Sequence, residues 1–75
     1  MSSKLPSVKP KELIKALLKL GFIKRRQTGS HLVMRHPQTK EIVIIAIHPR
    51  DLKRGFLKDT LNQLGISVEE FRKLK

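Results

Sequence analysis

Apolar side chains recur at helical spacing in three parts of the chain. Between residues 11 and 20 they face away from the lysines, so an amphipathic helix is predicted, with Ser7 as a candidate N-cap and Pro10 in its first turn. A second helix is predicted from about residue 53 to 64, and each helix is followed by a glycine that can end it, Gly21 or Gly65. Ser67 and Glu70 have capping-box spacing, which predicts a short last helix.

Three segments between the two longer helices lack helical spacing and are typical of strands. They are residues 22–28, 31–36 and 41–47, separated by Gly29-Ser30 and by a turn at residues 37–40. In the second strand, Leu32 and Met34 lie on one face and His31, Val33 and Arg35 on the other. We therefore predict one α+β domain over residues 1–75, with a leader at 1–8 and a three-stranded antiparallel meander carrying both longer helices on one face.

The third predicted strand, residues 41–47, is apolar on both faces. An antiparallel strand with one face in water would alternate between apolar and polar residues. One face is expected to meet the helices. The other is then expected to meet a partner, a second copy of the chain or a folded-back terminus.

Charge narrows the choice of partner. The 75 residues include 17 Lys and Arg against 6 Asp and Glu, a formal net charge of +11. Such a field favours phosphate backbones, acidic proteins or anionic membranes. A membrane role would need exposed aromatic residues, but Phe22, Phe56 and Phe71 all fall in apolar patterns and are predicted to be core. This scarcity also disfavours stacking of bases on aromatic side chains, so a nucleic acid would be held by its phosphates and sugars.

The remaining composition excludes several classes of protein. Hydrophobic residues make up 39 % of the chain, more than a disordered tail would carry. There is no Cys, which excludes disulfides, thiolate zinc sites and a cysteine nucleophile. No apolar run is long enough to span a membrane and no signal peptide is recognisable, so a cytoplasmic protein is expected.

Several short motifs, taken together, resemble one known family. They are Glu12-Leu13-Ile14-Lys15 with Leu18, Gly21 and Phe22, then Gly29-Ser30-His31, then His48, Leu52-Lys53 and Gly55 before a Leu-rich helix. Over residues 5–74 this combination is similar to the HicA toxins of prokaryotic toxin–antitoxin modules. The chain departs from the family pattern at Ala46, where Pro is frequent, and at Phe56, where Thr is frequent.

The resemblance implies a fold like that of double-stranded-RNA-binding domains and a ribosome-independent mRNA interferase activity. It further implies one catalytic histidine, which maps onto His31, and neutralisation by a HicB-type antitoxin that covers the catalytic surface. No cofactor is implied.

The residues themselves fit RNA cleavage. RNA carries its own nucleophile, the 2′-hydroxyl, so cleavage needs proton transfers and positive charge but no metal. Histidine suits these transfers because imidazole titrates near neutral pH. His31 follows the Gly29-Ser30 turn, and no acidic residue occurs from Lys24 to His36. Candidate RNA-binding residues are Lys24, Arg25, Arg26, Gly29, Ser30 and Arg35. Strict alternation would place Lys24 and Arg26 opposite Arg25.

The other two histidines have different expectations. His48 is a candidate second proton-transfer group, although a strand-end His bonded to backbone is the alternative, and His36 beside Pro37 is expected to be solvated. The spacing of the three histidines matches no compact metal motif, so no metal site is predicted.

Two other functions fit the same residues. A non-catalytic RNA-binding module would share the basic surface but would not require Gly29-Ser30-His31. An interaction protein would use the apolar third strand to dock another chain, with the charge serving for orientation.

Overall fold

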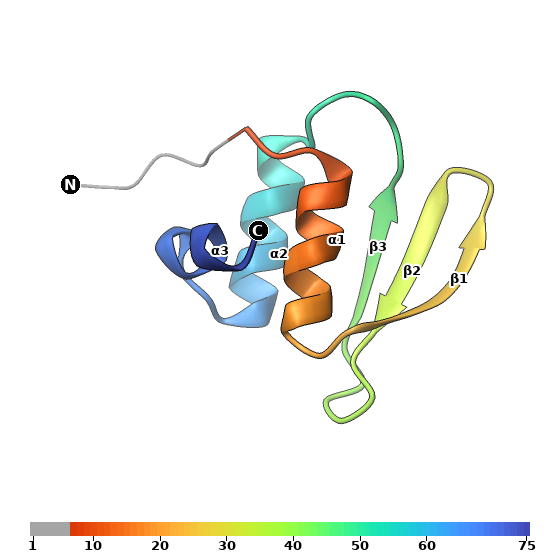
Figure 1. Cartoon of the computed structure of the whole chain (residues 1–75), viewed down its shortest axis with the longest axis horizontal. Helices are drawn as coiled ribbons and strands as arrows, with labels where there is room; N and C mark the ends of the chain where they lie inside the picture. The colour runs from red at the N-terminus through yellow and green to blue at the C-terminus, as the bar shows by residue number, and fades with distance from the viewer. Residues whose placement is uncertain (1–6) are drawn as a thin grey trace.

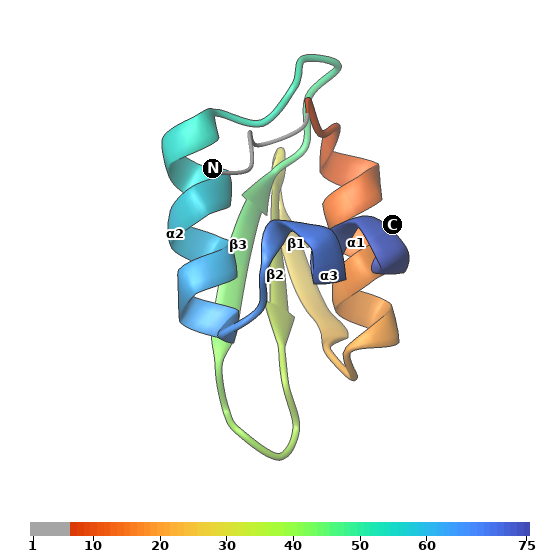
Figure 2. The ribbon, with the colours of Figure 1, turned by 90° about the vertical axis from the view of Figure 1, so that its left-hand side faces the viewer.

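The structure, a computed structural model, describes residues 7–75 and contains three helices and three strands in those residues. The order is α1 (Pro10–Lys19), β1 (Ile23–Thr28), β2 (His31–Arg35), β3 (Ile42–Ala46), α2 (Arg54–Leu64) and α3 (Val68–Leu74). The strands form one antiparallel sheet in the order β1-β2-β3. Helices α1 and α2 lie side by side on one face of that sheet, and α3 lies beyond them (Figures 1 and 2). The predicted meander with both longer helices on one face is confirmed.

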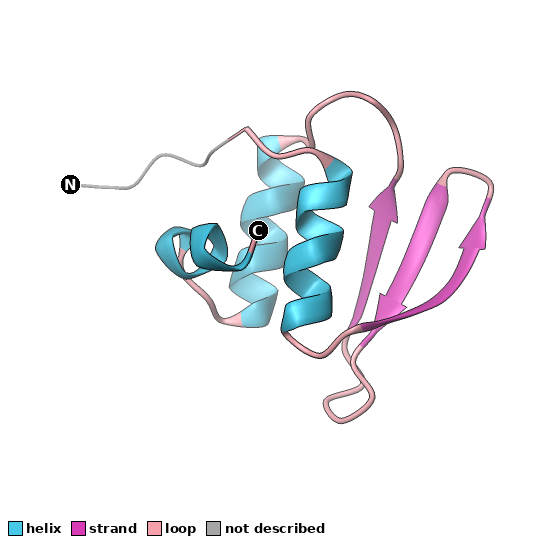
Figure 3. Cartoon of the chain, in the orientation of Figure 1, coloured by secondary structure: helices cyan, strands magenta, loops and turns pink. Residues whose placement is uncertain are grey.

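The core lies between the sheet and the helices, which are the magenta and cyan layers of Figure 3. Alternate residues of β2 and β3 point into it, and the helices supply one apolar stripe each. Phe71 of the short α3 is also fully buried, so this helix completes the core. The buried apolar residues are Val8, Leu13, Ala16, Leu17, Phe22, Leu32, Met34, Val43, Ile45, Leu52, Leu57, Leu61 and Phe71.

The ends of the elements differ from the prediction by one or two residues. Helix α1 has Lys9 rather than Ser7 at its N-cap, and its first turn is tied by the Lys9 N–H, which donates to the Glu12 carboxylate at 2.9 Å. Phe22 is a core residue before β1 rather than part of it. Val8, placed in the leader by its position, is buried, and the rest of the leader up to residue 6 lies outside the described residues.

The glycine stops and the last capping box are confirmed. Gly21 and Gly65 both adopt positive φ at the ends of α1 and α2. The Ser67 hydroxyl accepts from the Glu70 N–H at 3.1 Å, while the Glu70 carboxylate accepts from the Ser67 N–H at 2.9 Å.

His36 holds the turn between β2 and β3 instead of being solvated. Its Nδ1 accepts the backbone N–H groups of Gln38 and Thr39 at 3.1 and 3.2 Å, so its Nε2 carries the hydrogen and donates to the carbonyl of Leu20 at 3.2 Å. The ring also packs edge-on against Phe22, with 5.2 Å between centroids. The expectation of a solvated His36 is therefore wrong, because the residues that follow α1 pack against this turn.

Position 21 requires glycine for two reasons, its backbone conformation and the closeness of His36. Its φ is +102°, and a Cβ there would lie 2.9 Å from the His36 Nε2. We expect Gly21→Ala to lower the free energy of unfolding by about 1–3 kcal/mol, measured by urea denaturation. The matched control is Gly55→Ala in α2, where a Cβ meets nothing within 4 Å; there a gain of about 0.4–1 kcal/mol is expected. Equal effects of the two substitutions would contradict this account of Gly21.

Candidate functional site

The face of the sheet opposite the helices is not covered by any part of residues 7–75. Ile42 and Ile44 of β3 are 51 % and 53 % exposed, while Val43 and Ile45, which alternate with them along the strand, are buried. The strand is therefore apolar on both faces, as predicted, and only one face is used within the described chain. We call the uncovered side the outer face.

A β-bulge in β1 places two arginines on this outer face. Pairing with β2 shifts between Lys24 and Arg26, so Arg25 is the extra residue of the bulge. As a result Arg25 and Arg26 both line one pocket of about 280 Å³, together with Val33, Arg35 and Ile42. We call this the arginine pocket. Strict alternation would have placed Arg25 and Arg26 on opposite faces of the sheet. The bulge interrupts this alternation and so brings the two side chains to the same pocket.

Lys24 does not belong to the arginine pocket. It pairs with Met34, whose side chain is buried under the helices, so Lys24 belongs to the opposite side of the sheet from Arg35. Of the four cations predicted to bind RNA, the structure brings Arg25, Arg26 and Arg35 together and separates Lys24 from them.

His31 opens β2 on the outer face and is exposed. It is held between two strands, because its cross-strand partners are Thr28 on β1 and Ala46 on β3. The turn before it is sharp. Gly29 has φ +59° in the left-handed region, which favours glycine, and its carbonyl accepts from the Gln27 side chain at 3.1 Å.

His48 lies at the same end of the sheet as His31. The backbone N–H of Ile47 donates to the carbonyl of Ser30 at 2.6 Å, which continues the pairing of β2 with β3 past Ala46. His48 is therefore two residues beyond the partner of His31, on the same face and diagonal to it. The turn between β1 and β2, which precedes His31, and the connection from β3 to α2, which contains His48, lie at the same end of the sheet (Figure 1).

Both histidines line a single pocket, which we call the histidine pocket. It has a volume of about 300 Å³. Its wall combines the two imidazoles and one ammonium group with apolar side chains from β3 and from the start of α2. The lining residues are His31, Ile44, Ala46, His48, Leu52, Lys53 and Phe56. Lys53 and Phe56 were not among the residues expected at the site, because nothing in their spacing links them to His31.

The rings of His31 and His48 differ from that of His36 in their bonding. Within residues 7–75, no hydrogen bond holds the His31 or His48 ring, whereas His36 makes three. The alternative of a His48 satisfied by backbone is therefore not what the structure has. Two exposed imidazoles with free nitrogens can donate or accept protons at a bound molecule.

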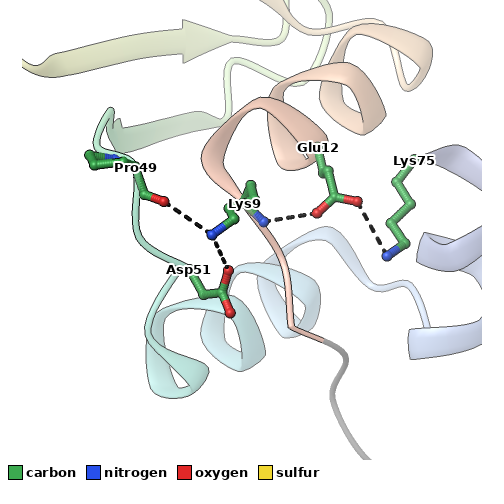
Figure 4. Close-up of polar contacts among 5 residues, drawn as sticks. All are labelled: Lys9, Glu12, Pro49, Asp51 and Lys75. Carbon is green, nitrogen blue, oxygen red and sulfur yellow. Dashed lines mark hydrogen bonds and ion pairs between the residues drawn. The ribbon is translucent and has the colours of Figure 1, made fainter.

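The loop that carries His48 is fastened to the start of α1. Figure 4 shows the Lys9 ammonium between the Pro49 carbonyl and the Asp51 carboxylate, at 3.0 Å from each. The N–H of Leu52 donates to the carbonyl of Val8 at 2.7 Å. These contacts fix the path of the chain from β3 to α2 beside the histidine pocket.

Glu12 extends this chain of contacts to the C-terminus. The Lys9 N–H lowers the pKa of the Glu12 carboxyl, and Lys75, 3.5 Å away, lowers it further. A lowered pKa in the folded state means that this contact stabilises the fold above the ordinary pKa of a glutamate and is lost as the pH falls. Both partners are partly exposed, so its contribution is small.

No group of three or more His, Asp or Glu side chains in residues 7–75 is placed to hold a metal ion. No helix there has the length and apolar character that crossing a bilayer requires.

The order of elements, the open three-stranded sheet and the helices on one face define an α+β protein with a fold like that of double-stranded-RNA-binding domains. A family described as the HicA toxin of bacterial toxin–antitoxin matches residues 10–66, which is more than half of the chain. The chain therefore belongs to the HicA toxin family, and a toxin role in a toxin–antitoxin module follows from that membership. No curated protein matches the chain.

Proposed function

We propose that this toxin is a metal-independent, ribosome-independent endoribonuclease that cleaves mRNA, with His31 as its catalytic histidine. The observation that carries the proposal is the exposed His31 ring in a pocket on the uncovered, cationic face of the sheet. A 2′-hydroxyl presented there would lose its proton to an imidazole while attacking the neighbouring phosphorus. Nearby ammonium and guanidinium groups would stabilise the charge that develops on the phosphate oxygens.

The test is cleavage of a defined mRNA by the purified protein without ribosomes and in excess EDTA. We expect cleavage with 2′,3′-cyclic phosphate ends, and none of a matched RNA whose riboses are 2′-O-methylated, because that substrate lacks the nucleophile. Tight binding of both RNAs without any cleavage would support the second candidate, a non-catalytic RNA-binding module.

The arginine pocket is proposed to hold phosphates that flank the cleaved bond. It lies beside the histidine pocket, since Ile42 lines one and Ile44, two residues along β3, lines the other. This separation is about 7 Å along the strand. Gly29 and Ser30 would bring the backbone of the β1–β2 turn close to the RNA, whereas Lys24 contributes only at the edge of the sheet.

Removing the three arginines should weaken RNA binding and its salt dependence. For Arg25→Ala/Arg26→Ala/Arg35→Ala, we expect the slope of log K against log salt to flatten by about 2, because each lost phosphate contact removes about 0.7. Fluorescence anisotropy over a salt series measures this. The control, Lys15→Ala/Lys19→Ala/Lys58→Ala, removes the same charge from exposed positions on α1 and α2. Equal slopes for the two variants would rule out a specific role for the pocket.

The outer face also suits the antitoxin that the family requires, which we propose to be of the HicB type. Its exposed isoleucines, Ile42 in the wall of the arginine pocket and Ile44 in that of the histidine pocket, offer apolar area next to a cluster of positive charge. An acidic segment with apolar side chains would complement both features. A partner seated there would cover His31 and so exclude RNA.

A further inference from the structure

We propose that His48 is the second proton-transfer group of the histidine pocket, so that His31 and His48 divide the two proton transfers of RNA cleavage. This inference rests on the proposed endoribonuclease function and deepens it. Its own evidence is the pairing of β2 with β3 and the pocket that the two rings share.

When both transfers occur in one concerted step, the reaction needs two groups because two protons move in opposite directions. A neutral imidazole takes the proton of the 2′-hydroxyl as the 2′-oxygen bonds to phosphorus. A protonated imidazole gives its proton to the 5′-oxygen as the bond from phosphorus to that oxygen breaks. The products are a 2′,3′-cyclic phosphate and a 5′-hydroxyl, and exchange with water restores the two rings. One imidazole cannot be protonated and neutral in the same step.

His48 is the group in the pocket that suits the second transfer. The titratable side chains lining it are His31, His48 and Lys53. An ammonium group gives up its proton poorly at neutral pH, whereas imidazole exchanges one readily, so Lys53 fits charge stabilisation better than acid–base work. The diagonal register places the His48 side chain on the same face as that of His31, which leaves space between the rings for a phosphate.

The surroundings of His48 also suit a group that acts on a ligand. Its ring makes no hydrogen bond within residues 7–75 and is exposed. The backbone on either side is held, by the Ile47 N–H on Ser30 and by the Lys9 ammonium on Pro49. On its other side, His48 lines a second pocket with Lys9 and Lys11, so the ammonium groups that line the two pockets beside it are those of Lys9, Lys11 and Lys53, and Lys9 is paired with the Asp51 carboxylate. Lys9 is thus a positioning residue for His48.

The experiment compares wild type, His31→Ala and His48→Ala on two RNAs in EDTA. One RNA is ordinary, and the other carries sulfur in place of the 5′-oxygen at a single cleavage site. Sulfur leaves without protonation, so it restores cleavage by a variant that lacks the general acid and does nothing for one that lacks the base. We expect both variants to lose at least about 100-fold on ordinary RNA, and one of them, not both, to be rescued by sulfur.

The pH profile separates a proton-transfer role from a structural one. Two titrating groups give wild type a bell-shaped dependence of kcat/KM on pH, and each variant should lose one limb of it. A His48 that only supported the fold would lower the rate at every pH and keep the bell. Thermal melting and RNA affinity of His48→Ala should match wild type, as should those of the control Gln38→Ala, which is exposed in the turn at the opposite end of the sheet.

The outcomes separate this inference from the proposed function. If wild type does not cleave RNA, both fall. If wild type cleaves and His31→Ala does not, but His48→Ala stays within about 10-fold of wild type, only the role of His48 is overturned. Retention of a complete bell-shaped profile by His48→Ala also overturns that role.

Discussion

Replacing His31 with alanine is expected to reduce RNA cleavage by about 10²–10⁴-fold, the range that a positioned acid or base contributes. The loss should fall on kcat, and RNA affinity should change little, because the arginine pocket that is proposed to hold the phosphates is made of other residues. The fold should also survive. His31 is exposed, and no hydrogen bond within residues 7–75 depends on its ring.

The measurement is a cleavage time course under single-turnover conditions, with melting curves and RNA anisotropy recorded on the same preparations. Thr28→Ala is the matched control. It truncates the β1 residue directly opposite His31, on the same exposed face of the sheet, and leaves the imidazole in place. Cleavage by His31→Ala at the wild-type rate would remove this histidine from the mechanism. A similar loss in Thr28→Ala would show that the geometry of this part of the outer face matters more than the imidazole.

Much of the fold follows from local patterns in the sequence. Apolar spacing defines α1 and α2, and the positive φ of Gly21 and Gly65 occurs where a helix must stop. The apolar character of β3 on both faces indicated a second face beyond the one that meets the helices, and within residues 7–75 Ile42 and Ile44 on that face are exposed; what covers it stays a prediction. Each of these features depends on a few neighbouring residues, so it can be predicted from the sequence alone.

The site was less accessible to prediction because its residues meet through pairing between strands. The bulge at Arg25 has no signature in the residues around it, yet it decides that Arg25 and Arg26 share a pocket. Likewise, His48 is 17 positions from His31, and only the register of β2 against β3 brings them to one pocket. The expectation of a solvated His36 was wrong for a related reason, because its partners Leu20 and Phe22 directly follow α1 and lie far from His36 in the sequence.

A chain of polar contacts links the end of α3 to the loop beside the histidine pocket. Lys75 pairs with Glu12, Glu12 accepts from the N–H of Lys9, and the Lys9 ammonium holds Pro49 and Asp51 beside His48 (Figure 4). Each contact is exposed and weak. The Lys75–Glu12 contact at the α3 end of the chain is supported by the packing of α3 on α1, to which the buried Phe71 belongs.

Replacing Phe71 with alanine is therefore expected to destabilise the whole domain, by about 3–5 kcal/mol. Phe71 has no exposed surface and is among the largest fully buried side chains, so truncation would leave a cavity between α3 and α1. A domain this small has little stability to lose, and a large part of the variant would be unfolded at 37 °C. Urea denaturation measures the change, with Lys73→Ala as the control because Lys73 is exposed on the same helix.

The stability of Phe71→Ala also tests whether a helix outside the family match is part of the folded domain. Helix α3 lies beyond residue 66, where the family match ends, so nothing in that match requires it. A loss below about 1 kcal/mol would mean that α3 is an appendage to a fold complete without it. If α3 is integral, Phe71→Ala should lose RNA cleavage only in proportion to its unfolded fraction and recover on cooling. His31→Ala should stay folded and inactive at every temperature, since removing an acid–base group leaves packing unchanged.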